Sequence, residues 1–440
     1  MAVISHAQFS SEDRLPSDAT QAVAFFWLSA FYFVYCARPE DWIPLLGHVS
    51  LAKITGLFVL LAMLFTAGRG PRSINNLPKE VYYLFFLTAI LFASSVLSPV
   101  WKGGAFWATV DFAKVIVAWI ATFLLVTTLA RFRRIVFVQA ASVVVISIVA
   151  LTNARTSPRL GSVLGGIYSN PNDLAIAIVL CLPFCLAFLL TAKTAARKLI
   201  WCLAILPMMA ALFLTGSRSG FIDLIVSGTV LLWHFGIKGR RPQLILGTGL
   251  IGVLLFVLFG QVVMERFSAI SDSSVSSETA EVALASYEER RLAMEKSLDA
   301  IAQYPILGVG TTNFETYSGM WREVHMSYLQ IAAEGGIPAL IVYLLYFGRG
   351  FTNLRRLRRM QPDSETLLFA GAAHSSLVGF VVGACFAPVA YLYFPYFAVC
   401  YTSVLLAMAK EKAPVAETAP SRFRFANVDL KGRRSRALTL

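Results

Sequence analysis

Long apolar runs separated by short polar segments dominate the chain. A helix that crosses the hydrocarbon core of a bilayer needs about 17 to 25 mostly apolar residues. Only helices and closed barrels satisfy their backbone hydrogen bonds in lipid, and barrel strands alternate rather than run continuously apolar. The pattern therefore predicts an all-α integral membrane protein with about twelve transmembrane helices. The expected spans are residues 21–37, 51–68, 81–98, 106–130, 135–151, 174–192, 199–214, 221–235, 244–264, 326–347, 367–386 and 391–409.

Composition supports a lipid-embedded chain. Of the 440 residues, 57% are hydrophobic and 14% are charged, far from the balance of a soluble domain. The net charge of +13 does not indicate nucleic-acid binding, because the lysines and arginines fall in short clusters between apolar runs. All six cysteines lie within apolar stretches, so neither a disulfide framework nor a thiolate metal site is expected.

The distribution of lysine and arginine predicts the orientation. Alternate connecting segments are basic, which places them and both termini on the cytoplasmic side of the membrane. The one long outside segment contains good helix formers over 287–303, which predicts a small helical cap outside the cytoplasm, between the ninth and tenth spans. The expected organisation is a cytoplasmic segment 1–20, spans one to nine over 21–264 with a polar outside segment near 155–173, the cap over 265–325, spans ten to twelve over 326–409 and a basic cytoplasmic tail over 410–440.

A turn of small residues on the outer side, Thr215-Gly-Ser-Arg-Ser-Gly220, carries a single arginine. Small residues let a ligand approach the backbone, and the planar guanidinium of Arg218 suits phosphate oxygens. Ser217 and Ser219 are candidate binding groups beside it. The alternative is a tight turn whose arginine extends to lipid headgroups.

Two further outside positions carry candidate chemistry. Arg290 and Arg291 lie on the cap helix, where nearby glutamates could instead neutralise an ordinary solvated pair. His325 lies where the chain re-enters the membrane, and histidine exchanges a proton near neutral pH. Glu334 follows nine residues later, so contact with His325 requires a break in the helix, which Gly335, Gly336 and Pro338 make possible. An interfacial histidine without a function is the alternative.

The polar segment near 155–173 is too Gly-rich to stay helical. Its candidate binding groups are Arg155, Arg159, Asn170 and Asn172, and the asparagines could hydrogen-bond sugar hydroxyls. Helix capping is the competing role, favoured for Asn172 or Asp173.

Ionisable residues also occur inside expected spans. Asp111 and Lys114 are either functional or a structural ion pair on one helix face. His234 and His374 have no partner visible in the sequence.

Taken in order, these motifs resemble the O-antigen ligase and polymerase superfamily of bacterial membrane glycosyltransferases. The resemblance is best over residues 161–346. Met326 is a departure, because the family usually has asparagine after the histidine. Its motifs are the Gly and Asn-Pro-Asn segment 166–172, the turn 215–220, a cap arginine that spacing assigns to Arg290, Pro305-Ile-Leu-Gly-Val-Gly310 with Asn313-Phe314, and His325 with Leu329, Glu334 and Gly336.

The resemblance implies a bacterial inner-membrane protein whose cap is periplasmic. It also implies transfer of a whole glycan from an undecaprenyl diphosphate-linked donor to an acceptor on the periplasmic face. Arg218, Arg290 and His325 are then the expected catalytic residues, with Arg291, Asn313 and Glu334 among the groups that bind substrate. A diphosphate leaving group needs fixed positive charge, which arginines supply without a metal or cofactor. A ligase that uses lipid A core as acceptor is the first expectation, with a polymerase or a protein-glycosylating enzyme as alternatives. A transporter of lipid-linked sugars or anions is a different class, but the polar features concentrate on one side of the second half.

Overall fold

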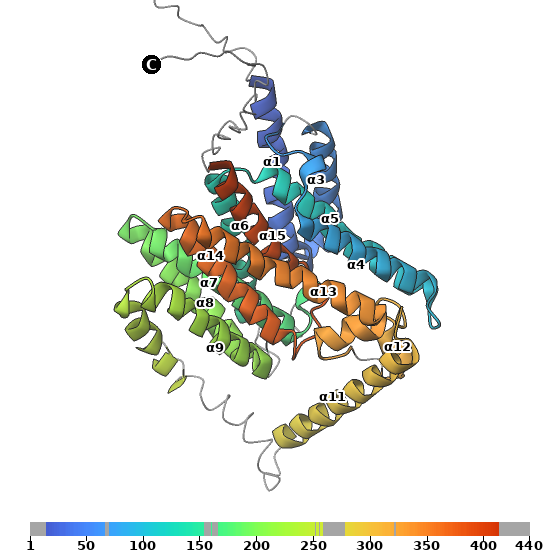
Figure 1. Ribbon diagram of the computed structural model, residues 1–440. Coiled ribbons are helices and arrows are strands. Elements are labelled where there is room, and N and C mark those ends of the chain that lie inside the picture. Colours follow the sequence, from blue (N-terminus) through green and yellow to red (C-terminus); the bar gives the residue numbers. More distant parts are fainter. Residues whose placement is uncertain are drawn as a thin grey trace, which may run out of the picture.

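The computed structural model describes residues 15–66, 70–153, 160, 166–250, 252–254, 256–257, 278–320 and 323–412. Every regular element in these ranges is helical, as predicted, and the helices gather into one bundle (Figure 1). The long helices are α1 (Leu15–Ala37), α3 (Leu51–Thr66), α4 (Lys79–Val96), α5 (Lys102–Leu125), α6 (Leu129–Asn153), α7 (Pro171–Thr191), α8 (Ala195–Thr215), α9 (Arg218–Leu232), α11 (Glu278–Gln303), α13 (Ser327–Arg359), α14 (Ser364–Gly383) and α15 (Tyr393–Lys412).

Nine of the expected spans correspond to helices in the described ranges that are long and apolar enough to cross a membrane. Helix α3 has 16 residues and is short for a span. The ninth expected span, 244–264, lies largely outside the described residues. Helix α15 is long, but it is less apolar and lies almost wholly inside the bundle, where protein rather than lipid surrounds it. The protein is therefore a multi-pass membrane protein, and the total of twelve spans stays a prediction.

The connections expected on the cytoplasmic side lie together at one end of the bundle. Arg72, which follows α3, forms a bidentate ion pair with Glu411 at the end of α15. The start of α4 meets α13 there through Glu80, whose carboxylate lies 2.9 Å from Nε of Arg349. These contacts place the end of α3, the start of α4 and the ends of α13 and α15 at the same end of the bundle. The membrane face that this end occupies stays a prediction.

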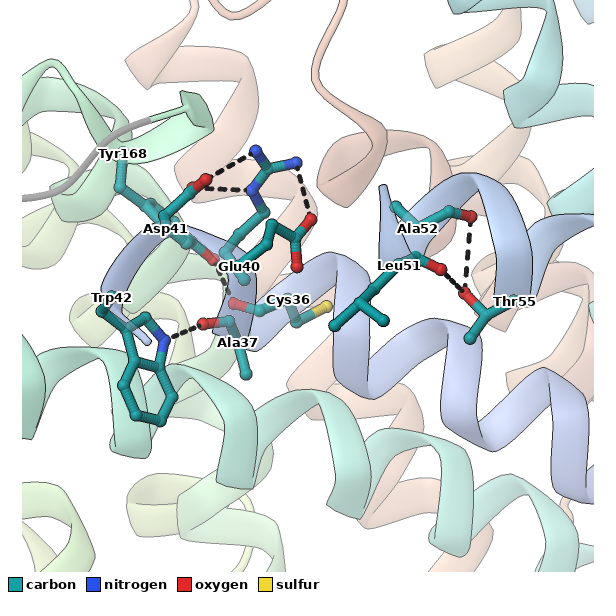
Figure 2. A network of polar contacts seen from close by, with 10 residues as sticks. Cys36, Ala37, Glu40, Asp41, Trp42, Leu51, Ala52, Thr55 and Tyr168 are labelled. Carbon is teal, nitrogen blue, oxygen red and sulfur yellow. Dashed lines mark hydrogen bonds and ion pairs between the residues drawn. The ribbon is translucent and has the colours of Figure 1, made fainter. Parts of the chain in front are cut away.

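At the opposite end, a polar cluster around Arg38 joins α1 to the segment before α7 (Figure 2). Arg38 adopts left-handed backbone dihedrals and donates two hydrogen bonds to Asp41, with Glu40 3.5 Å away. The hydroxyl of Tyr168 donates to the carbonyl of Cys36 over 2.7 Å. Gly166 passes so close that a Cβ there would lie 2.4 Å from the Arg38 guanidinium. This polar cluster fixes the start of the segment that leads into α7.

The predicted helix over 287–303 is confirmed as the second part of α11, which ends just before Tyr304-Pro305. Helix α11 runs along the edge of the bundle and contacts α13 and the short helix α12 (Phe314–Ser318) (Figure 1). A small apolar core separate from the main one holds this unit together. Its buried members are Ala300, Val309, Phe314, Val324 and Ala333.

Candidate active site

A tight turn between α8 and α9 positions Arg218. Gly216 ends α8 in the left-handed conformation, and Ser217 caps α9 by accepting a hydrogen bond from the amide of Gly220 over 3.1 Å. Gly220 packs against α7 so closely that a Cβ there would lie 2.7 Å from the Cβ of Ala175. Arg218 is thus the first residue of α9, where the helix dipole adds to its positive charge.

The two serines beside Arg218 join this turn to the start of α7. Ser217 Oγ donates to Oδ1 of Asn172 over 2.6 Å and lies 2.9 Å from Oγ of Ser219. Asn170 caps α7 by accepting from the amide of Asn172. The capping role therefore falls on Asn170 rather than on Asn172 or Asp173, because Pro171 occupies the first helical position and makes the preceding residue the cap. Arg155 and Arg159 lie outside the described residues.

Arg290 from α11 comes within electrostatic range of Arg218. Burial, together with the positive charge of Arg218, lowers the pKa of Arg290. Nε of Arg290 is buried and has no hydrogen-bond partner among the described residues. Neither arginine forms an ion pair with a described carboxylate. Two cations held together without a neutralising acid form a site that favours a doubly charged anion.

Arg291, the other arginine of the cap helix, points away from this pair. Its side chain is 67% exposed and forms an ion pair with Glu295 over 3.0 Å, one helical turn later. The spacing argument that singled out Arg290 thus agrees with the geometry. A binding role is therefore carried forward for Arg290 only, and Arg291 is its matched control.

His325 lies in the stretch that leads from the cap into α13. Val324 beside it is buried in the small core with Ala300 of α11. The carboxylate of Glu323 lies close enough to Asp173 for their charges to interact, and Asp173 follows the asparagine that binds Ser217. The stretch carrying His325 is therefore within electrostatic range of the start of α7. The catalytic role of the imidazole stays a prediction.

Glu334 is hydrogen-bonded within the protein. Its buried carboxylate accepts a hydrogen bond from the hydroxyl of Tyr391 over 2.7 Å. Its carbonyl accepts from Ser94 Oγ over 2.6 Å and from the amide of Gly310 over 3.0 Å. Glu334 thus fixes the turn after α11 against α13, and a contact with substrate stays a prediction.

The expected break in α13 is present at Gly336, which has φ 79° and ψ 174°. It falls after Glu334, so the stretch from Ser327 to Glu334 remains helical and His325 precedes it. The amide of Ile337, freed by the break, donates to the carbonyl of Pro305 over 2.8 Å. The break therefore serves to receive the turn at 305–310.

Asn313 is likewise bound within the protein. Its side-chain amide lies within hydrogen-bond distance of Ser98 Oγ, at 2.8 Å, and of the carbonyls of Trp101 and Val309, both at 3.1 Å. These bonds tie the turn after α11 to the link between α4 and α5. A sugar-binding role for Asn313 stays a prediction.

The ionisable residues noted in the expected spans contact other charged or polar side chains. Asp111 and Lys114 form the ion pair considered above. His234, expected to have no partner, lies 2.9 Å from His374 and 2.9 Å from Arg358, which corrects that expectation. Contacts between residues that far apart in the chain leave no signal in one sequence.

Asp223 was not among the expected site residues. It lies five residues after Arg218 on α9 and is 1% exposed, and neither carboxylate oxygen has a described hydrogen-bond partner. A Cβ on Gly383 of α14 would lie 2.4 Å from its Oδ2. An acidic residue inside the apolar run 221–235 is a signal that would have identified it.

Among the described residues, no group of three or more His, Cys, Asp or Glu side chains is placed to hold a metal ion.

Part of the chain is similar to a known protein family. No curated protein gave a significant match to the chain. The family model described as O-antigen ligase matches residues 203–344, which include Arg218, Arg290, His325 and Glu334. This match confirms the resemblance to the O-antigen ligase and polymerase superfamily that the motifs predicted.

Proposed function

We propose that the protein is a membrane glycosyltransferase that moves a glycan en bloc from undecaprenyl diphosphate to an acceptor on the periplasmic face. The observation that carries this proposal is the pair of cations Arg218 and Arg290, which lie within electrostatic range of each other and have no described acidic partner. A pair of this kind suits a diphosphate, whose negative charge grows as it leaves the sugar. The family match to O-antigen ligase supports the same reaction class.

In the proposed reaction, an acceptor hydroxyl oxygen attacks the anomeric carbon of the donor. The bond from that carbon to the diphosphate oxygen breaks, and the diphosphate leaves with the electron pair. His325 takes the proton of the attacking hydroxyl, or orients the diphosphate while another base takes the proton. Arg218 and Arg290 stabilise the leaving group without a metal, and attack opposite to it inverts the anomeric centre.

Lipid A core as acceptor, hence a ligase, is our first assignment. A polymerase differs only in accepting another lipid-linked repeat unit. A transporter is less well supported, because Arg218 and Arg290 come within electrostatic range of each other and do not form matching sites in two halves of the chain.

Turnover of the purified protein tests the proposal. Wild type, mixed with a polyprenyl diphosphate glycan and an acceptor, should release polyprenyl diphosphate together with a larger glycoconjugate. Arg218→Ala, Arg290→Ala and His325→Ala should each lose at least about 100- to 1,000-fold in rate while expressing normally, since each removes a group that acts in the transition state. Arg291→Ala is the matched control and should keep its activity. Normal turnover in the first three variants, or flux of the donor without bond cleavage, would contradict the proposal.

A further inference from the structure

A cavity of about 490 Å³ lies at the end of the bundle that holds the Arg72–Glu411 and Arg349–Glu80 ion pairs. It is lined by the link between α3 and α4, the start of α4 and the C-terminal parts of α5, α13 and α15. Its volume is within the range of sites that hold small ligands or headgroups. None of its described lining residues belongs to α7, α9 or α11. The cavity is therefore separate from the candidate active site.

The lining of the cavity is strongly basic. It contains five basic and two acidic side chains, which are Arg72, Lys79, Arg349, Arg356 and Lys410, with Glu80 and Glu411. Glu411 is paired with Arg72 over 2.7 Å. Glu80 is paired with Arg349 over 2.9 Å. The remaining three cations form no ion pair with a described acid, so the lining has an excess of three positive charges.

The acids at the start of α14, at the same end of the bundle, do not cancel this excess. Asp363 does not line the cavity, and its carboxylate lies 3.7 Å from Nζ of Lys412. Glu365 also lies outside the lining and pairs with Arg133. Lys79, Arg356 and Lys410 thus remain available to an anion, and phosphate oxygens are the acceptors that such cations bind most strongly.

Apolar side chains continue from the cavity along the outside of two neighbouring helices. On α4, Tyr82 and Phe86 follow Lys79 at helical spacing, and both are exposed. On α13, the exposed Leu345 precedes Arg349 by one turn. Helices α4 and α13 pack side by side (Figure 1), and both are long and apolar enough to cross a membrane. A lipid whose headgroup occupied the cavity could therefore lay its hydrocarbon chains against these side chains, which a soluble phosphate compound would not use.

We infer that this cavity binds the phosphate headgroup of an anionic phospholipid, with the acyl chains along α4 and α13. A net negative headgroup is required, because the choline of a zwitterionic lipid would bring a further cation to a lining that already has three in excess. Basic pockets between membrane-spanning helices are suited to such headgroups. The bound lipid would neutralise Lys79, Arg356 and Lys410 and so hold the ends of α4, α13 and α15 together, apart from the proposed transfer reaction.

Lipid titration of the purified protein, followed by native mass spectrometry, tests the site. Phosphatidylglycerol should bind at least about tenfold more tightly than phosphatidylcholine. Arg356→Gln and Lys410→Gln should each weaken phosphatidylglycerol binding about fivefold, the factor expected for one basic residue at an anionic headgroup. Arg359→Gln is the matched control, because Arg359 is exposed on the same helix as Arg356 but does not line the cavity, and it should bind as wild type does. Thermal unfolding without added lipid checks that the three variants fold.

Competition with glycerol 3-phosphate separates a lipid from a soluble ligand. It should not displace phosphatidylglycerol, and phosphatidylglycerol with a diazirine in its acyl chain should label peptides of α4 and α13. Wild-type affinity in both Arg356→Gln and Lys410→Gln, or an equal loss in Arg359→Gln, would overturn the site. Displacement by glycerol 3-phosphate would overturn the lipid and assign the cavity to a soluble phosphate compound.

Discussion

Two guanidinium groups of like charge lie within electrostatic range of each other, and this arrangement costs free energy in the absence of a ligand. Burial and mutual repulsion both disfavour the charged form of Arg290. An anion bound between Arg218 and Arg290 would remove the repulsion and satisfy the buried Nε of Arg290. The pair is therefore arranged before the substrate binds, as a site for leaving-group stabilisation requires.

The hydrogen bond from Tyr391 to Glu334 links the segment just before α15 to α13. Tyr391→Phe should lower the free energy of unfolding by about 1 to 3 kcal/mol, because it leaves a buried carboxylate oxygen without that donor. Thermal unfolding in detergent measures the change. Tyr317→Phe is the control: its hydroxyl bond to Gln303 is exposed, so the loss should stay within about 0.5 kcal/mol. Equal stability of the two variants would remove Glu334 as a structural anchor.

Arg290 could be separated from Arg291 through the family resemblance, because the spacing back from Pro305 favours Arg290 as the arginine that matches the family's motif. The side-chain partners of Glu334 and Asn313 could not be predicted. Tyr391 is 57 residues from Glu334 and Ser98 is 215 residues from Asn313, so their contacts depend on how the helices pack. Periodicity carries no information about such contacts.

The break in α13 depends on the backbone freedom of glycine. Gly336→Ala should destabilise the protein by about 2 to 6 kcal/mol, since the residue has a positive φ and a Cβ would lie 2.2 Å from the carbonyl oxygen of Ile306. Gly348→Ala, later in the same helix and with open space around it, should be neutral or stabilising by up to about 1 kcal/mol. Unfolding of both variants in parallel is the measurement, and a neutral Gly336→Ala would show that the turn at 305–310 does not depend on this break.

Apolar runs predicted nine helices well because lipid demands long apolar segments. They were less informative for α3 and α15, where surrounding protein relaxes that demand. Asn353 of α13, for example, donates to Ser403 Oγ on α15 over 3.1 Å, a contact that allows a polar residue inside the bundle. The cap of α7 was misassigned because the fixed φ of Pro171, rather than the polarity of Asn172, sets where the helix begins.

The two ends of the bundle differ in what they carry. One end holds the Arg72–Glu411 and Arg349–Glu80 ion pairs. The other holds the polar cluster around Arg38, the turn at Arg218 and the cap helix. The basic connections at the first end favour a cytoplasmic position under the positive-inside rule. The orientation of the entire protein therefore decides whether the proposed site faces the periplasm.

Thiol labelling in intact cells tests this orientation. In a variant lacking the six native cysteines, Arg291→Cys should react with a membrane-impermeant maleimide, and Lys410→Cys should react only after the cells are permeabilised. Both positions are exposed, so access alone does not separate them. Labelling of Lys410→Cys in intact cells, with Arg291→Cys protected, would place the arginine pair in the cytoplasm.

Binding of a polyprenyl diphosphate to the purified protein in nanodiscs, measured without acceptor, isolates the role of Arg218 and Arg290 from the chemical step. Wild type and Arg291→Ala should bind with the same Kd, while Arg218→Ala and Arg290→Ala should each bind at least about tenfold more weakly, the loss expected for a charge-assisted hydrogen bond. Unchanged Kd values in both of the latter variants would contradict the assignment of the arginine pair to the donor diphosphate.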